Sequence, residues 1–229
     1  MGMRNRVAIL FPLGLVVLCL LAYANSLRAG FLFDDQFVIT QNPSINSLSP
    51  LPVTTRFVVD FTFRMNHALS GLKPAAFRLV NILIHAVNAL LLYGILRRTL
   101  RPHGPTGEGD VASDIVAFLS AAMGAVHPLQ VQAVTYISQR YELGMAMFLL
   151  GGLYAQTRSW EGDERKWLNI ALACCVVGMG CKEVMVTAPV VFILYDWCFA
   201  EGPFVIVVRR RARAYVALLL TWGVFAAIW

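Results

Sequence analysis

Charged side chains are scarce in this sequence, and their scarcity excludes an ordinary soluble domain. Asp, Glu, Lys and Arg make up 14% of the 229 residues, against about 25% in soluble domains. Hydrophobic residues reach 58%, and the mean hydropathy is +0.65. We therefore predict an integral membrane protein, whose length is best counted in spans of about 20 residues.

Cysteine is also sparse, and its placement excludes two kinds of small scaffold. The five cysteines lie within or at the ends of apolar runs and show no paired spacing. A disulfide framework or a zinc site needs such spacing, so we expect neither. We also find no internal repeat and no soluble domain. We predict no cofactor; a divalent metal remains an alternative, because two adjacent acids described below could hold one, although its remaining ligands are not visible.

Apolar runs dominate the chain and predict its fold. Their lengths exceed those of barrel strands, and a backbone in lipid must satisfy its own hydrogen bonds, so helices are expected. We predict an all-α integral membrane protein, a single polytopic domain over residues 1–229 with about seven transmembrane helices. The runs are 7–24, 79–96, 115–129, 143–157, 167–181, 184–198 and 214–229.

The basic residues predict how the chain is oriented. The net charge is +6, and strict alternation of the spans places twelve of the nineteen basic residues on one side. The positive-inside rule makes that side cytoplasmic, so the N-terminus is cytoplasmic and nucleic acid is not an expected partner. The membrane is a bacterial inner membrane or the endoplasmic reticulum. The twelve residues are Arg4, Arg6, Arg97, Arg98, Arg101, Arg158, Arg165, Lys166, Arg209, Arg210, Arg211 and Arg213.

The segment between the first two runs, about 25–78, is the first external loop in this topology. Its mixture of charged, apolar and aromatic residues predicts short amphipathic helices at the membrane surface. The chain ends at Trp229 within an apolar run. We therefore expect it to be the N-terminal part of a longer membrane module.

Two adjacent carboxylates, Asp34 and Asp35, stand just after the first run in the stretch GFLFDDQFVITQNPSI. An acid near a membrane boundary is unfavourable unless it is solvated, paired or functional. One interpretation is a solvated helix cap, since Asp is a good N-cap. The other is a general base at the outer face, with the second acid orienting it or a substrate.

The second run carries a polar stripe. Arg78, Asn81, His85 and Asn88 recur at steps of three, four and three, which places them on one face of a helix. Lipid does not accept such a face, so it is expected to point into the bundle. Hydrogen bonding between helices and lining of a wet cavity are both open. His85 is not expected to bind metal, because no second ligand has suitable spacing.

Five further polar residues are predicted at the outer face: His127, Arg140, Glu142, Lys182 and Glu183. His127 is expected to cap a helix end. Arg140 and Lys182 are exceptions to the excess of basic residues on the cytoplasmic side, and both could bind a phosphate. The alternative for Arg140 is a snorkelling or ion-paired residue, and for Lys182 it is a solvated turn. Acids, cations and an apolar bundle together suit a lipid-linked anion.

Four stretches, in order along residues 7–200, resemble the membrane region of the glycosyltransferase C superfamily. The resemblance is strongest to the transmembrane and tetratricopeptide-repeat O-mannosyltransferases and their bacterial relatives. The chain departs from that pattern at Arg78, where His is more usual. The stretches are GFLFDDQFVITQNPSI, FRLVNILIHAVNALLLYGIL, AVHPLQVQAVTYISQRYELG and KEVMVTAPVVFILYDW.

The resemblance implies an inverting enzyme that moves a sugar from a polyprenyl- or dolichyl-phosphate donor to an acceptor hydroxyl on the periplasmic or lumenal face. Asp34 or Asp35 would activate the acceptor, a protein or a glycan, while Arg140 and Lys182 hold the donor phosphate. Two alternatives remain: a non-catalytic membrane subunit, and a transporter or flippase of a lipid-linked substrate. A membrane partner subunit that completes the groove is also compatible with the short chain.

Overall fold

The structure is a computed structural model that describes residues 3–49, 54–100, 107–200 and 202–228, apart from the side chains of 3–6, 107–110, 224 and 228. Its α-helices are α1 (Met3–Tyr23), α2 (Phe57–Ser70), α3 (Pro74–Thr99), α4 (Gly107–Val126), α5 (Gln130–Thr135), α6 (Arg140–Arg158), α7 (Glu164–Met179), α8 (Ala188–Phe199) and α9 (Phe204–Ile228). Short 3₁₀ or π segments are η1 (Ala24–Arg28), η2 (Gln36–Thr40), η3 (Pro43–Asn46), η4 (Ile137–Gln139) and η5 (Glu183–Thr187).

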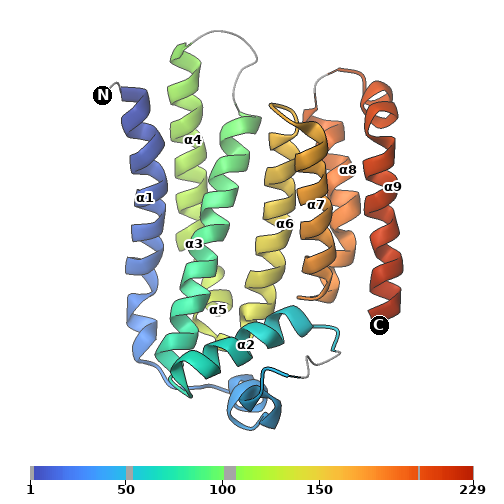
Figure 1. Cartoon of the computed structure of the whole chain (residues 1–229). Helices are drawn as coiled ribbons and strands as arrows, with labels where there is room; N and C mark the ends of the chain where they lie inside the picture. The colour runs from blue at the N-terminus through green and yellow to red at the C-terminus, as the bar shows by residue number, and fades with distance from the viewer. Residues whose placement is uncertain (1–2, 50–53, 101–106, 201, 229) are drawn as a thin grey trace.

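Each predicted apolar run forms the body of one helix. In chain order these are α1, α3, α4, α6, α7, α8 and α9, and they run alternately down and up side by side (Figure 1). The part of the chain that the structure describes contains no strand. The all-α prediction is therefore confirmed.

Local sequence sets several helix boundaries. Pro74 stands in the first turn of α3, where a missing N–H leaves no bond unmade. α4 stops at Val126, two residues before Pro128. α7 begins after Asp163, whose carboxylate accepts a hydrogen bond from the backbone N–H of Lys166 at 3.1 Å, as an N-cap should.

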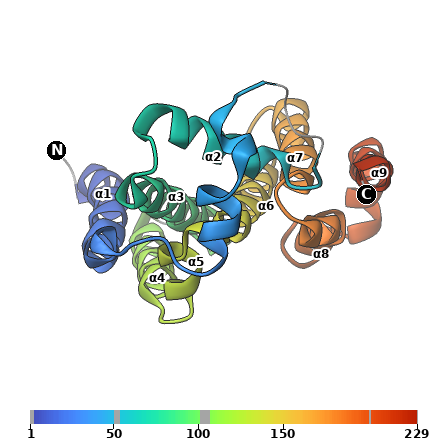
Figure 2. The ribbon, with the colours of Figure 1, turned by 90° about the horizontal axis from the view of Figure 1, so that it is seen from below.

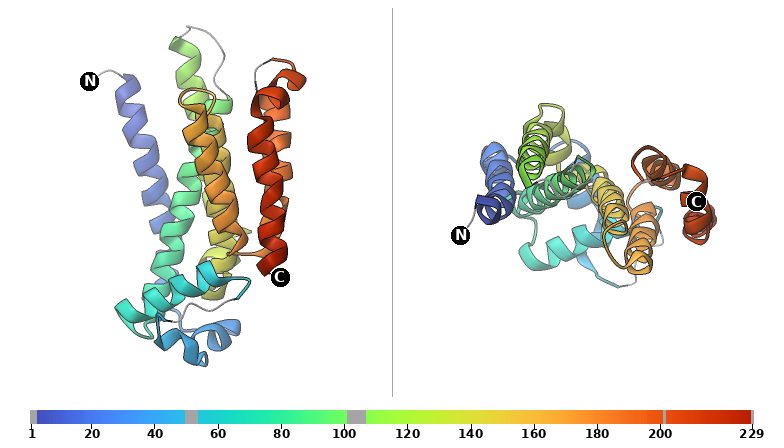
Figure 3. Two further views of the ribbon diagram at one scale, coloured as in Figure 1. Left: turned by 45° about the vertical axis from the view of Figure 1, so that its right-hand side comes forward. Right: turned by 90° about the horizontal axis from the view of Figure 1, so that it is seen from above.

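Helix α3 lies at the centre of one half of the bundle and packs against α1, α4 and α6, while α6 joins that half to α7. The two views of Figure 3 show α8 and α9 beyond α7 at the far edge. Close approach of α6 and α8 needs glycine at 152: a Cβ there would lie 2.3 Å from Cζ of Phe192. The interior is thus closely packed at this contact.

The outer faces of several helices are apolar and exposed. On α1 these include Leu13 and Leu21, on α4 Leu119 and Met123, and on α9 Leu220. Large contiguous apolar surfaces are rare on soluble monomers, so these faces suit contact with lipid.

Two helical stretches, Val7–Arg28 and Pro74–Thr99, are long and apolar enough to cross a membrane, and Val111–Val126 is a shorter apolar helix. The remaining helices do not meet this criterion within the described residues. Helix α8 has 12 residues, about 18 Å of helix, against about 30 Å of hydrocarbon. The structure therefore shows an all-helical bundle in which two of the described helices are long and apolar enough to cross a membrane.

The predicted loop helices form at the lower end of the bundle. Segments η1, η2 and η3 and helix α2 follow α1, and α2 lies across the ends of the long helices (Figure 1). Seen from below, α2 and α4 lie on opposite sides of α3 (Figure 2).

The opposite end of the bundle carries the basic residues of the last turns of α3 and α6, the first turn of α7 and the first half of α9. Of the predicted set, Arg101 lies outside the described residues, as do the side chains of Arg4 and Arg6.

Candidate active site

The lower end of the bundle gathers the residues that the sequence singles out. Three connections meet there: the loop after α1, the α4–α6 connection containing α5 and η4, and the turn between α7 and α8 (Figure 2). Acids and cations from distant parts of the chain therefore share one end of the molecule.

The two adjacent acids have different surroundings. Asp35 is fully buried, and its carboxylate accepts hydrogen bonds from the backbone N–H groups of Ser138 at 2.8 Å and Leu32 at 3.1 Å. Asp34 is exposed, and its backbone N–H donates to the Tyr136 hydroxyl at 2.8 Å. Its carboxylate has no hydrogen-bond or ion-pair partner among the described residues. Asp35 fixes the loop, and Asp34 presents an unengaged acid.

The backbone before Asp34 is strained. Phe33 has φ +42°, a left-handed conformation that is unfavourable for a bulky residue. Such strain persists only where the surroundings enforce it, and it concentrates at functional sites. Here the bonds to Asp34 and Asp35 hold the turn in place.

Arg78 holds the same loop from the side of α3. The residue is 1% exposed; its Nε donates to the Thr135 carbonyl at 2.9 Å, and its terminal nitrogens donate to the carbonyls of Ala29 and Gly30. One buried guanidinium thus links α3, the first loop and the end of α5.

Arg140 is enclosed by protein. It is 1% exposed, and its guanidinium donates to the side chains of Asn81 at 2.8 Å and Asn66 at 2.9 Å and to the Phe77 carbonyl at 2.8 Å. A weaker contact reaches the Thr62 hydroxyl at 3.3 Å. Every nitrogen of the fork has a partner from α2 or α3. The geometry makes Arg140 a link between helices, and a phosphate would have to displace these bonds.

The polar stripe of α3 faces inward. Asn81 donates to the carbonyls of Tyr136 and Ile137, each at 3.3 Å. His85 Nε2 lies 2.8 Å from the Ala125 carbonyl, and Asn88 donates to the Leu143 carbonyl at 3.1 Å. The stripe therefore pairs with backbone groups of α4, of α6 and of the connection between them.

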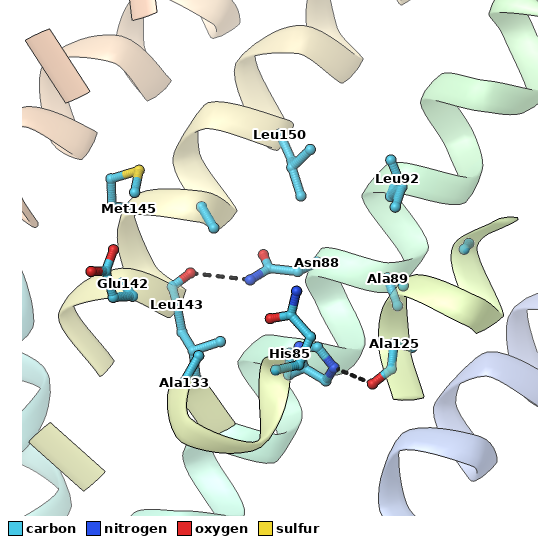
Figure 4. Close-up of a pocket in the computed structure, with 14 residues that line it drawn as sticks. His85, Asn88, Ala89, Leu92, Ala125, Ala133, Glu142, Leu143, Met145 and Leu150 are labelled. Carbon is cyan, nitrogen blue, oxygen red and sulfur yellow. Dashed lines mark hydrogen bonds between the residues drawn. The ribbon is translucent and has the colours of Figure 1, made fainter. Parts of the chain in front are cut away.

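A cavity of about 350 Å³ lies beside this stripe (Figure 4). The Oδ1 atom of Asn88 is buried there without a partner among the described residues. Most of the lining residues are apolar, and six of the fourteen are Ala or Gly, which leaves room for a slender ligand. His85, Asn88, Ala89 and Leu92 of α3, Ala121, Gly124 and Ala125 of α4, Gln130 and Ala133 of α5, and Glu142, Leu143, Met145, Ala146 and Leu150 of α6 line it.

Glu142 connects this cavity to the remaining predicted charges. Glu142 lines the cavity and forms an ion pair with Lys182, which lies at the start of the turn into α8. Beside it, Glu183 pairs with Arg56 at 2.8 Å. The N–H of its own backbone and the Arg56 guanidinium lower the pKa of Glu183 below its usual value of 4.5, against the opposing effect of partial burial.

Sequence reasoning missed a second set of polar contacts here. Tyr141 donates to Asp60 at 2.6 Å, and Thr54 donates to the other oxygen of Asp60 at 2.7 Å. Arg56 lies over the Tyr141 ring, 5.1 Å from its centroid. Arg56 and Asp60 are four residues apart around the start of α2, a spacing that brings their side chains near one another and could have drawn attention to them.

His127 stands apart from these groups. It is exposed just after α4, and its Nδ1 accepts a hydrogen bond from the Leu129 backbone N–H at 3.2 Å. Across the described ranges, no group of three or more His, Cys, Asp or Glu is placed to hold a metal ion.

These features define an all-helical, largely apolar protein with a polar end adjoining an apolar cavity. The chain belongs to the dolichyl-phosphate-mannose-protein mannosyltransferase family, whose profile matches residues 54–229. The resemblance inferred from the four stretches is therefore confirmed.

The curated relatives are considerably longer than this chain. Human protein O-mannosyl-transferase TMTC3 is 32% identical over 212 residues, covering 82% of this chain and 21% of that protein. Drosophila melanogaster Tmtc3 is 28% identical over 216 residues, covering 79% of this chain and 23% of that protein. Human TMTC2 is 29% identical over 199 residues, covering 76% of this chain and 22% of that protein. The chain spans about a fifth of these relatives. No solved structure matches it.

Proposed function

We propose that this chain forms a polytopic membrane unit, embedded by about seven helices, of an inverting glycosyltransferase that uses a polyprenyl- or dolichyl-phosphate sugar. The acceptor is a hydroxyl group, most simply a protein Ser or Thr. The observation that carries the proposal is the unengaged Asp34 carboxylate at the end of the bundle where Lys182 pairs with Glu142 of the cavity wall.

Asp34 is the proposed general base. Its carboxylate takes the proton of the acceptor hydroxyl while the hydroxyl oxygen forms a bond to the anomeric carbon of the sugar. The bond between that carbon and the phosphate oxygen breaks, and the lipid phosphate leaves with the electron pair. A single displacement of this kind inverts the anomeric centre. An exposed carboxylate can meet an acceptor that arrives from water.

Asp35 and Arg78 are proposed to position the base. Asp35 holds the loop to Ser138, and Arg78 holds it to α3. Fixed geometry at the reacting atoms lowers the barrier, so their substitution should reduce turnover by moving Asp34.

The donor lipid is proposed to place its tail in the cavity between α3 and α6 and its phosphate at Lys182. An ammonium at the rim can stabilise the charge that develops on the leaving phosphate, and the phosphate would replace Glu142 as its partner. Arg140 is the weaker candidate for the phosphate because its guanidinium is fully engaged; we assign it the role of holding α2 against α3.

The orientation follows from the charges. Basic residues gather at the end opposite the site, and the positive-inside rule places that end in the cytoplasm. The N-terminus is then cytoplasmic, and the site faces the lumen or periplasm.

The test is sugar transfer from a radiolabelled polyprenyl-phosphate donor to a Ser/Thr peptide in proteoliposomes. We expect transfer by the wild type, none by Asp34→Asn, and reduced transfer by Asp35→Asn. Exposed Glu161→Gln, at the other end of the bundle, is the matched control and should transfer as the wild type does.

Three outcomes would replace the proposal. Equal transfer by the wild type and Asp34→Asn would remove Asp34 as the base. Donor binding without transfer would favour a non-catalytic subunit, and movement of the donor across the bilayer without transfer would favour a flippase.

A further inference from the structure

A second cavity, of about 620 Å³, lies between α7 and α9 near the basic end of the bundle. Neither the family resemblance nor the proposed site uses it. Its lining is rich in arginine and otherwise mainly small or aliphatic. The residues are Glu164, Arg165, Leu168, Asn169 and Leu172 of α7 and Arg209, Arg210, Arg211, Ala212, Arg213, Ala214 and Ala217 of α9.

The arginines outnumber the acids that could neutralise them. Glu164 accepts from Arg210 and Arg211, each at 2.9 Å. Arg165, Arg209 and Arg213 line the same cavity, are exposed, and make no ion pair or hydrogen bond with the residues the structure describes.

Three uncompensated cations therefore face one space. Two of them, Arg209 and Arg213, are four residues apart on one helix, a spacing at which like charges repel. Arg165 adds a third positive charge from the facing helix. An anion in the cavity would relieve this repulsion, and a guanidinium fork suits phosphate oxygens.

A buried network fixes the wall that carries these groups. Arg211 donates to both oxygens of Asp196 at 3.0 and 2.9 Å and to Ser159 at 2.8 Å, and Tyr215 donates to Asp196 at 2.6 Å. The first half of α9 is thereby tied to α8 and to the turn before α7. The cavity is a preorganised feature of the fold.

The cavity changes character along its length. Helices α7 and α9 run in the same direction (Figure 1), so the arginines come first on both and Leu168, Leu172, Ala214 and Ala217 follow toward the middle of the bundle. From Arg209 to Ala217 the helix advances about 12 Å. The polar end of the cavity suits a lipid headgroup, and its apolar part suits the hydrocarbon chain attached to that headgroup. Free phosphate would contact the arginines alone and leave the apolar part of the cavity unoccupied.

We propose that the cavity between α7 and α9 binds an anionic phospholipid, with its phosphate at Arg165, Arg209 and Arg213 and the start of one acyl chain against Leu168, Leu172 and Ala217. The proposal does not rest on the transferase activity. It places a lipid site at the end opposite Asp34, in the leaflet where anionic lipids and basic residues attract one another.

Native mass spectrometry of the delipidated protein in detergent tests the site. The probes are phosphatidylglycerol, zwitterionic phosphatidylcholine and inorganic phosphate. We expect phosphatidylglycerol to bind and the other two to bind at least about tenfold more weakly. Each arginine near an anionic headgroup contributes roughly a fivefold change in affinity, so the triple variant R165Q/R209Q/R213Q should weaken phosphatidylglycerol binding by about a hundredfold.

Two controls separate the site from general charge. The triple variant R28Q/K73Q/K166Q removes the same charge from exposed residues outside the cavity and should bind as the wild type does. If a triple variant unfolds, the single variants Arg165→Gln and Lys166→Gln replace it. Arg165 lines the cavity and its neighbour Lys166 does not, so only Arg165→Gln should weaken phosphatidylglycerol binding. Ala217→Leu fills the apolar part and should weaken the phospholipid without affecting phosphate.

Equal binding of phosphatidylcholine, or equal losses in the two triple variants, would overturn the site. Phosphate binding as strong as phospholipid binding, with Ala217→Leu unchanged, would overturn the lipid assignment.

Discussion

Replacing Arg140 with Lys separates a structural role from a phosphate-binding role. The substitution keeps the positive charge and removes the fork that bonds Asn81, Asn66 and the Phe77 carbonyl. A single ammonium cannot reach all three, so at least one buried acceptor loses its partner at about 1–3 kcal/mol. Weaker packing against the ring of Phe63, 4.5 Å from the guanidinium carbon, adds to this. We expect a loss of about 3 kcal/mol.

Thermal unfolding in detergent measures this loss. For a chain of this size each kcal/mol corresponds to roughly 2–4 °C, so Tm should fall by about 6–12 °C. The exposed Arg28→Lys is the matched control and should melt with the wild type. In the folded fraction of Arg140→Lys the donor KM should stay near that of the wild type. An unchanged Tm together with a raised donor KM would refute the structural role and restore Arg140 as a phosphate ligand.

The remaining predictions concern the charges and packing near the site. Glu142→Gln frees Lys182 for the donor phosphate and should lower the donor KM, whereas Lys182→Gln should raise it; steady-state transfer kinetics measure both, and the reverse order would contradict the assignment. Gly152→Ala inserts a methyl 2.3 Å from a buried ring and should destabilise by about 1–3 kcal/mol, while Gly223→Ala, with open space around it, should not lower Tm. The lowered pKa of Glu183 means that its ion pair stabilises the fold above pH 4.5 and that this contribution is lost as pH falls through the lowered value. The Tm difference between the wild type and Glu183→Gln should therefore be present at pH 7 and should shrink as the pH falls below 4.5; a difference that does not change with pH would argue against the pair.

Hydrophobic runs predicted the helices well because the polar backbone of an apolar segment must satisfy its own hydrogen bonds, as a helix does. Each of the seven runs overlaps one α-helix. The short helices of the first loop were also expected. The runs predicted the number of membrane spans less well, since α8 has 12 residues against the roughly 20 that crossing requires.

The site was harder to predict because its contacts join residues that are distant in sequence. The roles of Asp34 and Asp35 could not be separated, since the difference depends on Ser138 and Tyr136, about 100 residues away. Arg140 looked like an unpaired outer cation because its partners lie on α2 and α3. No periodicity in the sequence reports which side chains meet across a bundle.

Photo-crosslinking tests the central claim, that the donor's tail lies in the cavity between α3 and α6. A polyprenyl-phosphate probe with a diazirine on its first isoprene units would be activated in proteoliposomes and its attachment sites mapped by mass spectrometry. We expect the probe to label Leu92, Ala121 and Leu150, and we expect excess unlabelled polyprenyl phosphate to prevent this labelling. The absence of competitor-sensitive label on these residues, or label spread over lipid-facing surfaces and insensitive to competitor, would contradict this claim.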